Sequence, residues 1–92
     1  MNIIICDDRI SDRKNLSDLL SDYGEKKNYE FAITEYDSGE QLCEEQSALE
    51  ASQLLFLDIN MQGMDGLKTA MRIKEKYPKL PVVLVTAYMN YA

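Results

Sequence analysis

The amino-acid sequence predicts an α/β fold, with an open parallel sheet and helices on both of its faces. Short apolar runs at residues 2–6, 54–57 and 82–85 indicate three of the strands. Continuous runs of this kind are typical of strands that are covered on both faces in a parallel sheet. Because helical patterns separate the runs, we expect parallel strands joined by right-handed crossover connections.

A further strand, second in chain order, has a different pattern. Tyr29, Phe31 and Ile33 alternate with less apolar positions that include Glu30 and Thr34. Such alternation suits a half-exposed edge strand. If this edge strand lies beside the first, strands one and three are central neighbours, and the expected strand order is 2-1-3-4.

The first helix is expected between the first two strands. Ser11 is the expected N-cap, and Gly24 is expected to end the helix. The apolar positions recur at helical spacing, as required of a helix with one buried face. These positions are Leu16, Leu19, Leu20 and Tyr23.

Two more helices are expected further along the chain. Ser38 and Gln41 form a capping-box pair that starts a polar helix running through residues 44–50. Pro78 and Pro81 should stop the third helix before the last strand. The third helix has its apolar stripe at Leu67, Ala70, Ile73 and Tyr77.

Composition excludes several classes of function. A net charge of −6 is a poor match for nucleic acid or an anionic membrane, so we expect no direct binding of either by these 92 residues. The absence of histidine removes Ser-His-Asp and Cys-His catalysis and most zinc enzymes. Cys6 and Cys43 lack CxxC spacing and are expected to be reduced packing residues. No apolar run approaches a membrane span and no signal peptide is visible, so the expected location is cytoplasmic.

Acidic residues follow two of the predicted central strands. Asp7 and Asp8 end the first strand, and Asp58 ends the third. Ligands of open α/β sheets bind beyond the carboxyl ends of the strands, where these side chains should converge. Carboxylates in such a cluster repel one another unless a cation lies between them, and Mg²⁺ prefers hard oxygen ligands. The simpler alternative is that these aspartates only cap a helix and a turn.

Taken together, these segments resemble the receiver domain of bacterial two-component response regulators. The resemblance rests on the Asp7-Asp8 pair, on the segment LFLDINMQGMDGL with Asp58, and on VVLVTA, which ends with Thr86 and Ala87. The order of these motifs covers the whole chain. The resemblance implies a flavodoxin-like receiver fold and a signalling domain rather than an enzyme.

The resemblance also implies roles for individual residues. Asp58 would be the phosphoacceptor for a histidine kinase. Asp8, with Asp7 partly through water, would hold Mg²⁺ together with Asp58 and the backbone carbonyl of Asn60. Thr86 would donate its hydroxyl to the phosphoryl oxygen and sense phosphorylation.

The chain departs from the family pattern in two places. Gln62 stands where the family usually has proline. The family also has a fifth strand ending in a lysine, and no lysine follows the fourth predicted strand here. The expected domain is therefore residues 1–92 as the first three quarters of a receiver, with the fourth helix only begun and the fifth strand and fifth helix missing.

The final residues, TAYMNYA, resemble receivers that precede LytTR-type DNA-binding domains. This likeness implies an output DNA-binding domain in the full-length protein, which would regulate transcription. Tyr88 would act with Thr86 as a switch residue, or would belong to the apolar face of a fourth helix. The uncovered fourth strand also suggests a homodimer.

Three other functions fit parts of the sequence. An EF-hand loop matches at Asp58 and Asn60, but its twelfth position is Thr69 rather than glutamate. A haloacid-dehalogenase-like phosphatase would need a second aspartate at the position of Asn60. A pseudo-receiver, which keeps the fold as a phosphorylation-independent interaction module, is the strongest alternative.

Overall fold

A computed structural model describes residues 1–61, 63 and 65–85 of the chain. Its elements, in order, are β1 (Asn2–Cys6), α1 (Ile10–Lys27), β2 (Ala32–Tyr36), α2 (Gly39–Glu44), α3 (Gln46–Ala51), β3 (Leu54–Asp58), α4 (Gly66–Lys76) and β4 (Val82–Val85). Among the described residues, no helix is long and apolar enough to cross a bilayer.

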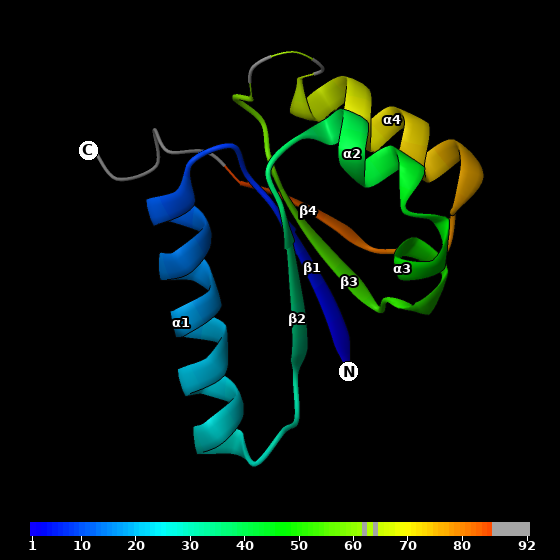
Figure 1. Ribbon diagram of the computed structural model, residues 1–92. Helices are drawn as coiled ribbons and strands as arrows, with labels where there is room; N and C mark the ends of the chain where they lie inside the picture. Colours follow the sequence, from blue (N-terminus) through cyan, green and yellow to red (C-terminus); the bar gives the residue numbers. More distant parts are fainter. Residues whose placement is uncertain (62, 64, 86–92) are drawn as a thin grey trace.

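The four strands form one parallel sheet in the order β2-β1-β3-β4, which confirms the predicted order. Ile4 of β1 is paired with Thr34 on one side and with Leu55 on the other. Helix α1 covers one face of the sheet, and α2, α3 and α4 lie on the opposite face (Figure 1). All strands run in one direction, so their carboxyl ends lie at a single edge of the sheet.

The main core lies between the sheet and the three helices α2, α3 and α4. Alternate residues of β1 and β3 point into it, as the two-residue repeat of a strand requires. Its buried members are Ile4, Cys6, Leu42, Leu49, Leu55, Leu57, Met61, Ile73 and Leu80. On the opposite face, Ile3 and Ile5 are each 1% exposed. Both faces of β1 are therefore closed, as its continuous apolar run predicted.

Helix α1 begins and ends at residues other than those predicted. Arg9 is the N-cap and makes no side-chain capping bond, and Ser11 lies inside the helix, so the predicted Ser11 cap is wrong. Gly24 is also not the end, because the helix continues to Lys27 and closes at Asn28 in the left-handed conformation, φ 62°. Gly24 is instead a buried position inside the helix. The Phe31 ring packs so closely against it that a Cβ on residue 24 would lie 3.0 Å from the ring.

The predicted apolar stripe of α1 is only partly buried. Leu19 is 67% exposed and Tyr23 is 50% exposed, whereas Leu16 and Leu20 are partly covered. Strand β2 likewise begins at Ala32, later than the alternation from Tyr29 suggested. Leu19 and Tyr23 therefore lie toward solvent, and the buried stripe of α1 is narrower than the sequence predicted.

The second predicted helix is divided in two. Ser38 caps α2 by accepting a hydrogen bond from the Gln41 N–H at 3.1 Å, as predicted. The chain leaves the helical conformation at Glu45 (φ −92°, ψ 67°), and α3 follows. The break lets each short helix place one leucine in the core, Leu42 from α2 and Leu49 from α3.

Helix α4 ends at Lys76, before Pro78, as predicted. Its buried side differs slightly from the predicted stripe, because Thr69 and Ile73 are fully covered whereas Leu67 is 52% exposed.

In β4, Val83 and Leu84 are each 40% exposed. This strand pairs only with β3 in the described part of the chain.

Candidate metal and phosphoacceptor site

Three carboxylates meet at the carboxyl ends of β1 and β3. One oxygen from each of Asp7, Asp8 and Asp58 can be chosen so that all lie within 4.8 Å of one another. Asp7 and Asp58 are buried, at 7% and 4% exposure, and Asp8 is partly exposed. The sequence predicted this convergence from the neighbouring positions of the two strands.

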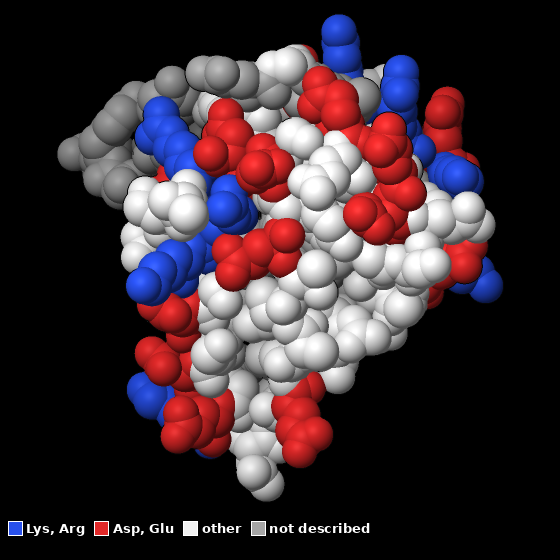
Figure 2. All heavy atoms as spheres, in the orientation of Figure 1, with Lys and Arg blue, Asp and Glu red and all other residues white. Residues whose placement is uncertain are grey.

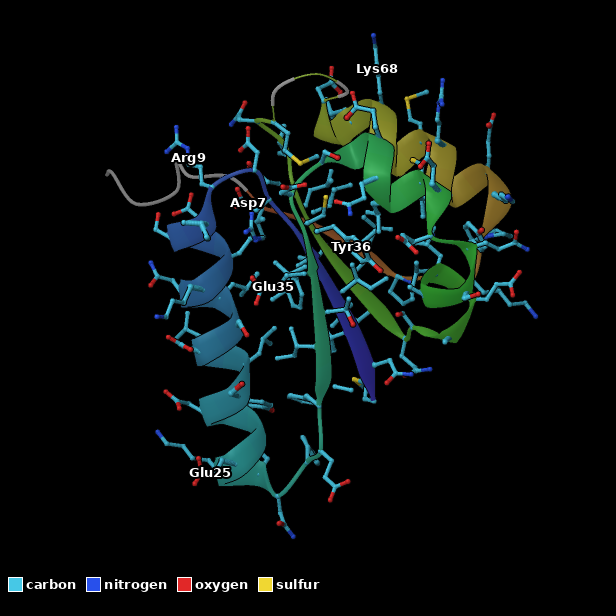
Figure 3. The ribbon with its side chains drawn as sticks, viewed as in Figure 1. Asp7, Arg9, Glu25, Glu35, Tyr36 and Lys68 are labelled. Atoms are coloured by element: carbon cyan, nitrogen blue, oxygen red, sulfur yellow. The ribbon has the colours of Figure 1, made fainter. Side chains whose placement is uncertain are left out.

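The loop that follows β1 holds Asp7 from several directions. The Asp7 N–H donates to the Tyr36 carbonyl oxygen at 3.1 Å, which extends the pairing of β1 with β2. The Asp7 carboxylate accepts a hydrogen bond from the Arg9 N–H at 2.9 Å. Figure 3 shows Asp7 at the end of β1, with the Arg9 side chain directed away from the sheet. The Asp7 side chain therefore fixes the residue that precedes the first turn of α1.

The acidity of Asp7 reflects this environment. Burial raises the pKa of its carboxyl to about 6, the hydrogen bond from the Arg9 N–H partly opposes the shift, and the negative charge of Asp58 raises the pKa further. Ionised Asp7 is thus unfavourable beside Asp58 without a compensating cation. A divalent cation bound here would favour the ionised form.

A short loop after β3 places Asp58. The Asn60 N–H donates to the Asp58 carboxylate at 3.2 Å, and the Ile59 N–H donates to the Val85 carbonyl at 2.9 Å. The loop closes where the Gly66 N–H donates to the Ile59 carbonyl at 3.1 Å. These bonds fix the backbone that follows Asp58 and the orientation of its carboxylate.

Helix α4 starts directly beneath this loop. Asp65 caps it by accepting a hydrogen bond from the Lys68 N–H at 2.8 Å. A Cβ on Gly66 would collide with the Asp58 carbonyl oxygen and lie 2.6 Å from the Ile59 Cα. Only glycine therefore allows α4 to approach the residue that carries the central carboxylate.

Several predicted site residues cannot be compared with the structure. Thr86 and Tyr88, the predicted sensing and switch residues, lie outside the described residues, as does Gln62. Asn60 lies beside the cluster through its N–H. The role of its carbonyl oxygen as a metal ligand stays a prediction.

Two residues at the site were not predicted from the sequence. One is Gly66, for which the Asp-Gly pair before a helical pattern was the available signal. The other is Arg13, which contacts the Asp7 backbone with its guanidinium. Its position five residues after Asp8, one turn into a helix, could have indicated a side chain that folds back on the loop.

The cysteine beside the cluster is a packing residue. Cys6 is fully buried, and its Sγ lies 3.7 Å from the Met61 Sδ. Burial raises the pKa of the Cys6 thiol to about 12, and the negative charge of Asp7 adds to the shift. Cys6 and Cys43 are both free thiols, as expected. A protonated, enclosed thiol is a poor nucleophile or metal ligand.

A hard divalent cation fits the donor set. The cluster offers carboxylate oxygens only, from two neighbouring strands, and Mg²⁺ is commonly held by one or two carboxylates with several waters. Asp8 is partly exposed, so the cluster is open to solvent and to an incoming ligand. The site therefore has the chemistry of a magnesium site.

Charge is mixed on the face of the molecule shown in Figure 2. Figure 2 shows acidic and basic side chains interspersed over one face of the molecule, with the basic ones mainly over α1 and α4. That face has no continuous basic surface of the kind that binds nucleic acid. The distribution agrees with the net charge of −6.

The fold and the cluster together define a class of protein, the open α/β domains that bind a ligand at the carboxyl ends of their central strands. Within that class, the profile of the response regulator receiver domain matches residues 3–92. The chain belongs to the response regulator receiver domain family.

Curated relatives agree with this assignment. The chain is 39% identical to the response regulator protein FleR of Pseudomonas aeruginosa over 79 residues, which is 86% of this chain and 16% of FleR. It is 35% identical to the transcriptional regulatory protein ZraR of Escherichia coli K12 over 90 residues, 98% of this chain and 19% of ZraR. The chain thus spans less than a fifth of the length of these two relatives.

Solved structures show the same fold. The N-terminal domain of a response regulator/sensory box/GGDEF three-domain protein from Carboxydothermus hydrogenoformans superposes with a TM-score of 0.80 at 30% identity, covering 100% of this chain and 69% of that one. The CheX–CheY–BeF3–Mg²⁺ complex of Borrelia burgdorferi gives a TM-score of 0.80 at 23% identity, covering 95% of this chain and 62% of that one. The predicted flavodoxin-like receiver fold is confirmed.

Proposed function

We propose that the chain is a phosphoacceptor domain, in which Asp58 receives a phosphoryl group from the phosphohistidine of a histidine kinase. The observation that carries the proposal is the convergence of Asp7, Asp8 and Asp58 within 4.8 Å at the ends of neighbouring strands. A carboxylate is a competent nucleophile for phosphoryl transfer, which depends mainly on positioning and on neutralising charge.

In the proposed reaction, an Asp58 carboxylate oxygen attacks the phosphorus. The new O–P bond forms as the N–P bond to the kinase imidazole breaks, and the imidazole nitrogen keeps the electron pair. Asp7 and Asp8, with Asp58 and the Asn60 carbonyl, would hold Mg²⁺. The ion would supply positive charge for the phosphoryl oxygens. The Asn60 N–H donates a hydrogen bond to one oxygen of the Asp58 carboxylate. This bond would keep the other carboxylate oxygen of Asp58 oriented for the reaction.

The signalling partners belong to the same proposal. We infer that phosphorylation of Asp58 is sensed by the Thr86 hydroxyl, with Tyr88 as a second switch residue. The change would pass to an output domain, a DNA-binding one in a transcription regulator. The names of FleR and ZraR as regulatory proteins support this inference. The domain itself would act in the cytoplasm as a signalling module rather than as an enzyme.

The extent of the domain is a further proposal. We propose that residues 1–92 are the first three quarters of a receiver. The chain covers 69% of the solved N-terminal domain from Carboxydothermus, which supports this proportion.

Labelling with a small acyl phosphate donor tests the proposed function. With Mg²⁺ present, we expect one phosphoryl group per chain, released by hydroxylamine as an acyl phosphate should be. Asp58→Asn should abolish labelling. Asp18→Asn, which changes an exposed aspartate on α1, should label like the unaltered protein.

Each other outcome points to a different function. Label on serine or threonine, or label that persists in Asp58→Asn, would contradict the proposal. Continuous turnover of a phosphomonoester would indicate a phosphatase. No label in the presence of demonstrable Mg²⁺ binding would indicate a pseudo-receiver.

A further inference from the structure

One side chain links α1, β2 and the loop that carries Asp7. Arg13 lies early in α1, and its Nη1 donates to the Asp7 carbonyl oxygen at 2.8 Å. Its Nε donates to a Glu35 carboxylate oxygen of β2 at 3.2 Å. The Arg13 side chain is 14% exposed, against 40% for Glu35. Figure 3 shows Glu35 on the side of β2 that faces α1.

These contacts complete the restraint of Asp7. Its N–H bonds to the Tyr36 carbonyl, its carboxylate accepts from the Arg9 N–H, and its carbonyl accepts from Arg13. With both backbone groups bonded, the peptide that joins Asp7 to Asp8 has little freedom to rotate. The direction of the Asp8 side chain depends on that peptide.

We propose that Arg13 is a positioning residue for the metal site. Its guanidinium binds the backbone behind the carboxylates, so it fixes the loop without neutralising the carboxylates directly. Glu35 holds the guanidinium from the opposite side, and a planar fork suits two partners in different directions. This inference rests on the proposed function, because it assumes that Asp7, Asp8 and Asp58 bind Mg²⁺.

The sign of the effect separates positioning from simple electrostatics. A fixed positive charge near a cation site opposes cation binding through Coulomb repulsion. If Arg13 acted by charge alone, its removal would therefore strengthen Mg²⁺ binding. If Arg13 acts by holding the Asp7 carbonyl, its removal weakens binding because the ligands are no longer preorganised.

Calorimetric titration with MgCl₂ measures this sign. Arg13→Gln should bind Mg²⁺ about tenfold more weakly than the unaltered chain, the loss typical of residues that orient metal ligands. Arg9→Gln is the matched control, because it removes the same charge from an exposed side chain of the same loop. It should bind Mg²⁺ equally well or more tightly, since the Arg9 N–H that bonds to Asp7 is retained.

Two conservative variants extend the series. Arg13→Lys keeps the positive charge but lacks the forked donors of the guanidinium. It should therefore also bind Mg²⁺ more weakly than the unaltered chain and should not fully restore the binding lost in Arg13→Gln. Glu35→Gln leaves the bond from Arg13 to the Asp7 carbonyl in place, so this variant should lose less Mg²⁺ affinity than Arg13→Gln. If Arg13→Gln does not fold, Arg13→Lys and Glu35→Gln still carry the comparison.

A metal-free measurement tests the restraint of the loop by Arg13 separately from Mg²⁺ binding. In EDTA, amide hydrogen exchange at Asp7 and Arg9 should be faster in Arg13→Gln, while exchange at Ile4 and Leu55 in the sheet stays unchanged. Faster exchange without any Mg²⁺ binding by the unaltered chain would refute the proposed function alone. Unchanged exchange at Asp7 and Arg9, or tighter Mg²⁺ binding by Arg13→Gln, would overturn the inference itself.

Discussion

The α-carbon of Gly66 lies against the backbone carbonyl of Asp58, in a space that admits no side chain. The same glycine donates its N–H to the Ile59 carbonyl at 3.1 Å, so the start of α4 and the end of β3 are in direct contact. The backbone of the phosphoacceptor candidate is thus packed against a helix start.

We therefore expect Gly66→Ala to destabilise the fold by about 3 kcal/mol, because the added methyl group meets backbone atoms that cannot rotate away. Chemical denaturation would measure the loss. Gly24→Ala is the milder comparison, since its methyl group would lie 3.0 Å from the Phe31 ring and 3.1 Å from the Tyr29 carbonyl oxygen, whereas at Gly66 it would lie 2.6 Å from the Ile59 Cα. Equal losses in the two variants would show that the contact with Asp58 has no special cost.

Mg²⁺ should raise the melting temperature of the protein. A ligand that binds only the folded state stabilises it by mass action, and the three clustered carboxylates exist as a site only when β1 and β3 are paired. Asp8→Ala should remove the rise, whereas Asp18→Ala should keep it. A full rise in Asp8→Ala, measured by thermal unfolding with and without EDTA, would place the metal elsewhere.

Stability without metal should depend on the protonation of Asp7. The folded pKa of Asp7, about 6, lies above the ordinary aspartate value of 3.8, so the folded state binds more protons than the unfolded chain in this interval. The Asp7 contribution is therefore fully favourable below about pH 4 and is lost as the pH rises to about 6. The loss should be on the order of 3 kcal/mol, from about 1.4 kcal/mol per unit of pKa difference.

Denaturation of the unaltered chain and of Asp7→Asn in EDTA across this interval measures the effect. The difference between their unfolding free energies should change with pH, since only one of them has the titrating carboxyl. Parallel pH profiles would show that the Asp7 pKa is not raised in the folded state.

The apolar side chains that β4 exposes in the described part of the structure should promote self-association of this chain. Val83 and Leu84 are each 40% exposed, and β4 pairs only with β3 among the described residues. An apolar strand edge is a template for pairing with another chain. We expect dimers in sedimentation at micromolar concentration, and Val83→Lys should reduce them. Leu67→Lys, at an exposed apolar position on α4, should leave association unchanged. Monomers at all concentrations would contradict the prediction.

The sequence identified the strands more accurately than the helix ends. Strands β1 and β4 begin and end where their apolar runs do. Burial on a parallel sheet accounts for the run of β1, whereas the expected burial of β4 on both faces was wrong for the described structure, in which Val83 and Leu84 are exposed. The predicted ends of α1 were wrong because tertiary contacts, rather than the local sequence, decide where this helix begins and ends. The helix begins at Ile10, just after the Arg9 N–H that bonds to the Asp7 carboxylate, and it runs past the buried Gly24 to Lys27.

The candidate site likewise has one part that could be predicted from the sequence and one part that could not. The acidic cluster could be predicted, because residues at the ends of neighbouring parallel strands necessarily meet. Arg13 and Gly66 could not, because their roles depend on which backbone atoms lie within reach in the folded chain. Asp7 and Gly66 make contacts that no local pattern specifies.

Strand β1 is the first element of the chain and a central strand of the sheet, and this has a consequence for biosynthesis. Ile3 pairs with Ile33 of β2 and with Leu54 of β3, so both partners of the strand are translated after it. The apolar residues of β1 leave the ribosome without a neighbour and wait first for residues 32–36 and then for residues 54–58. Long-range pairing of this kind closes large loops and slows folding. During translation, the strand that precedes Asp7 and Asp8 therefore keeps at least one unpaired edge until the residues of β3 have been synthesised.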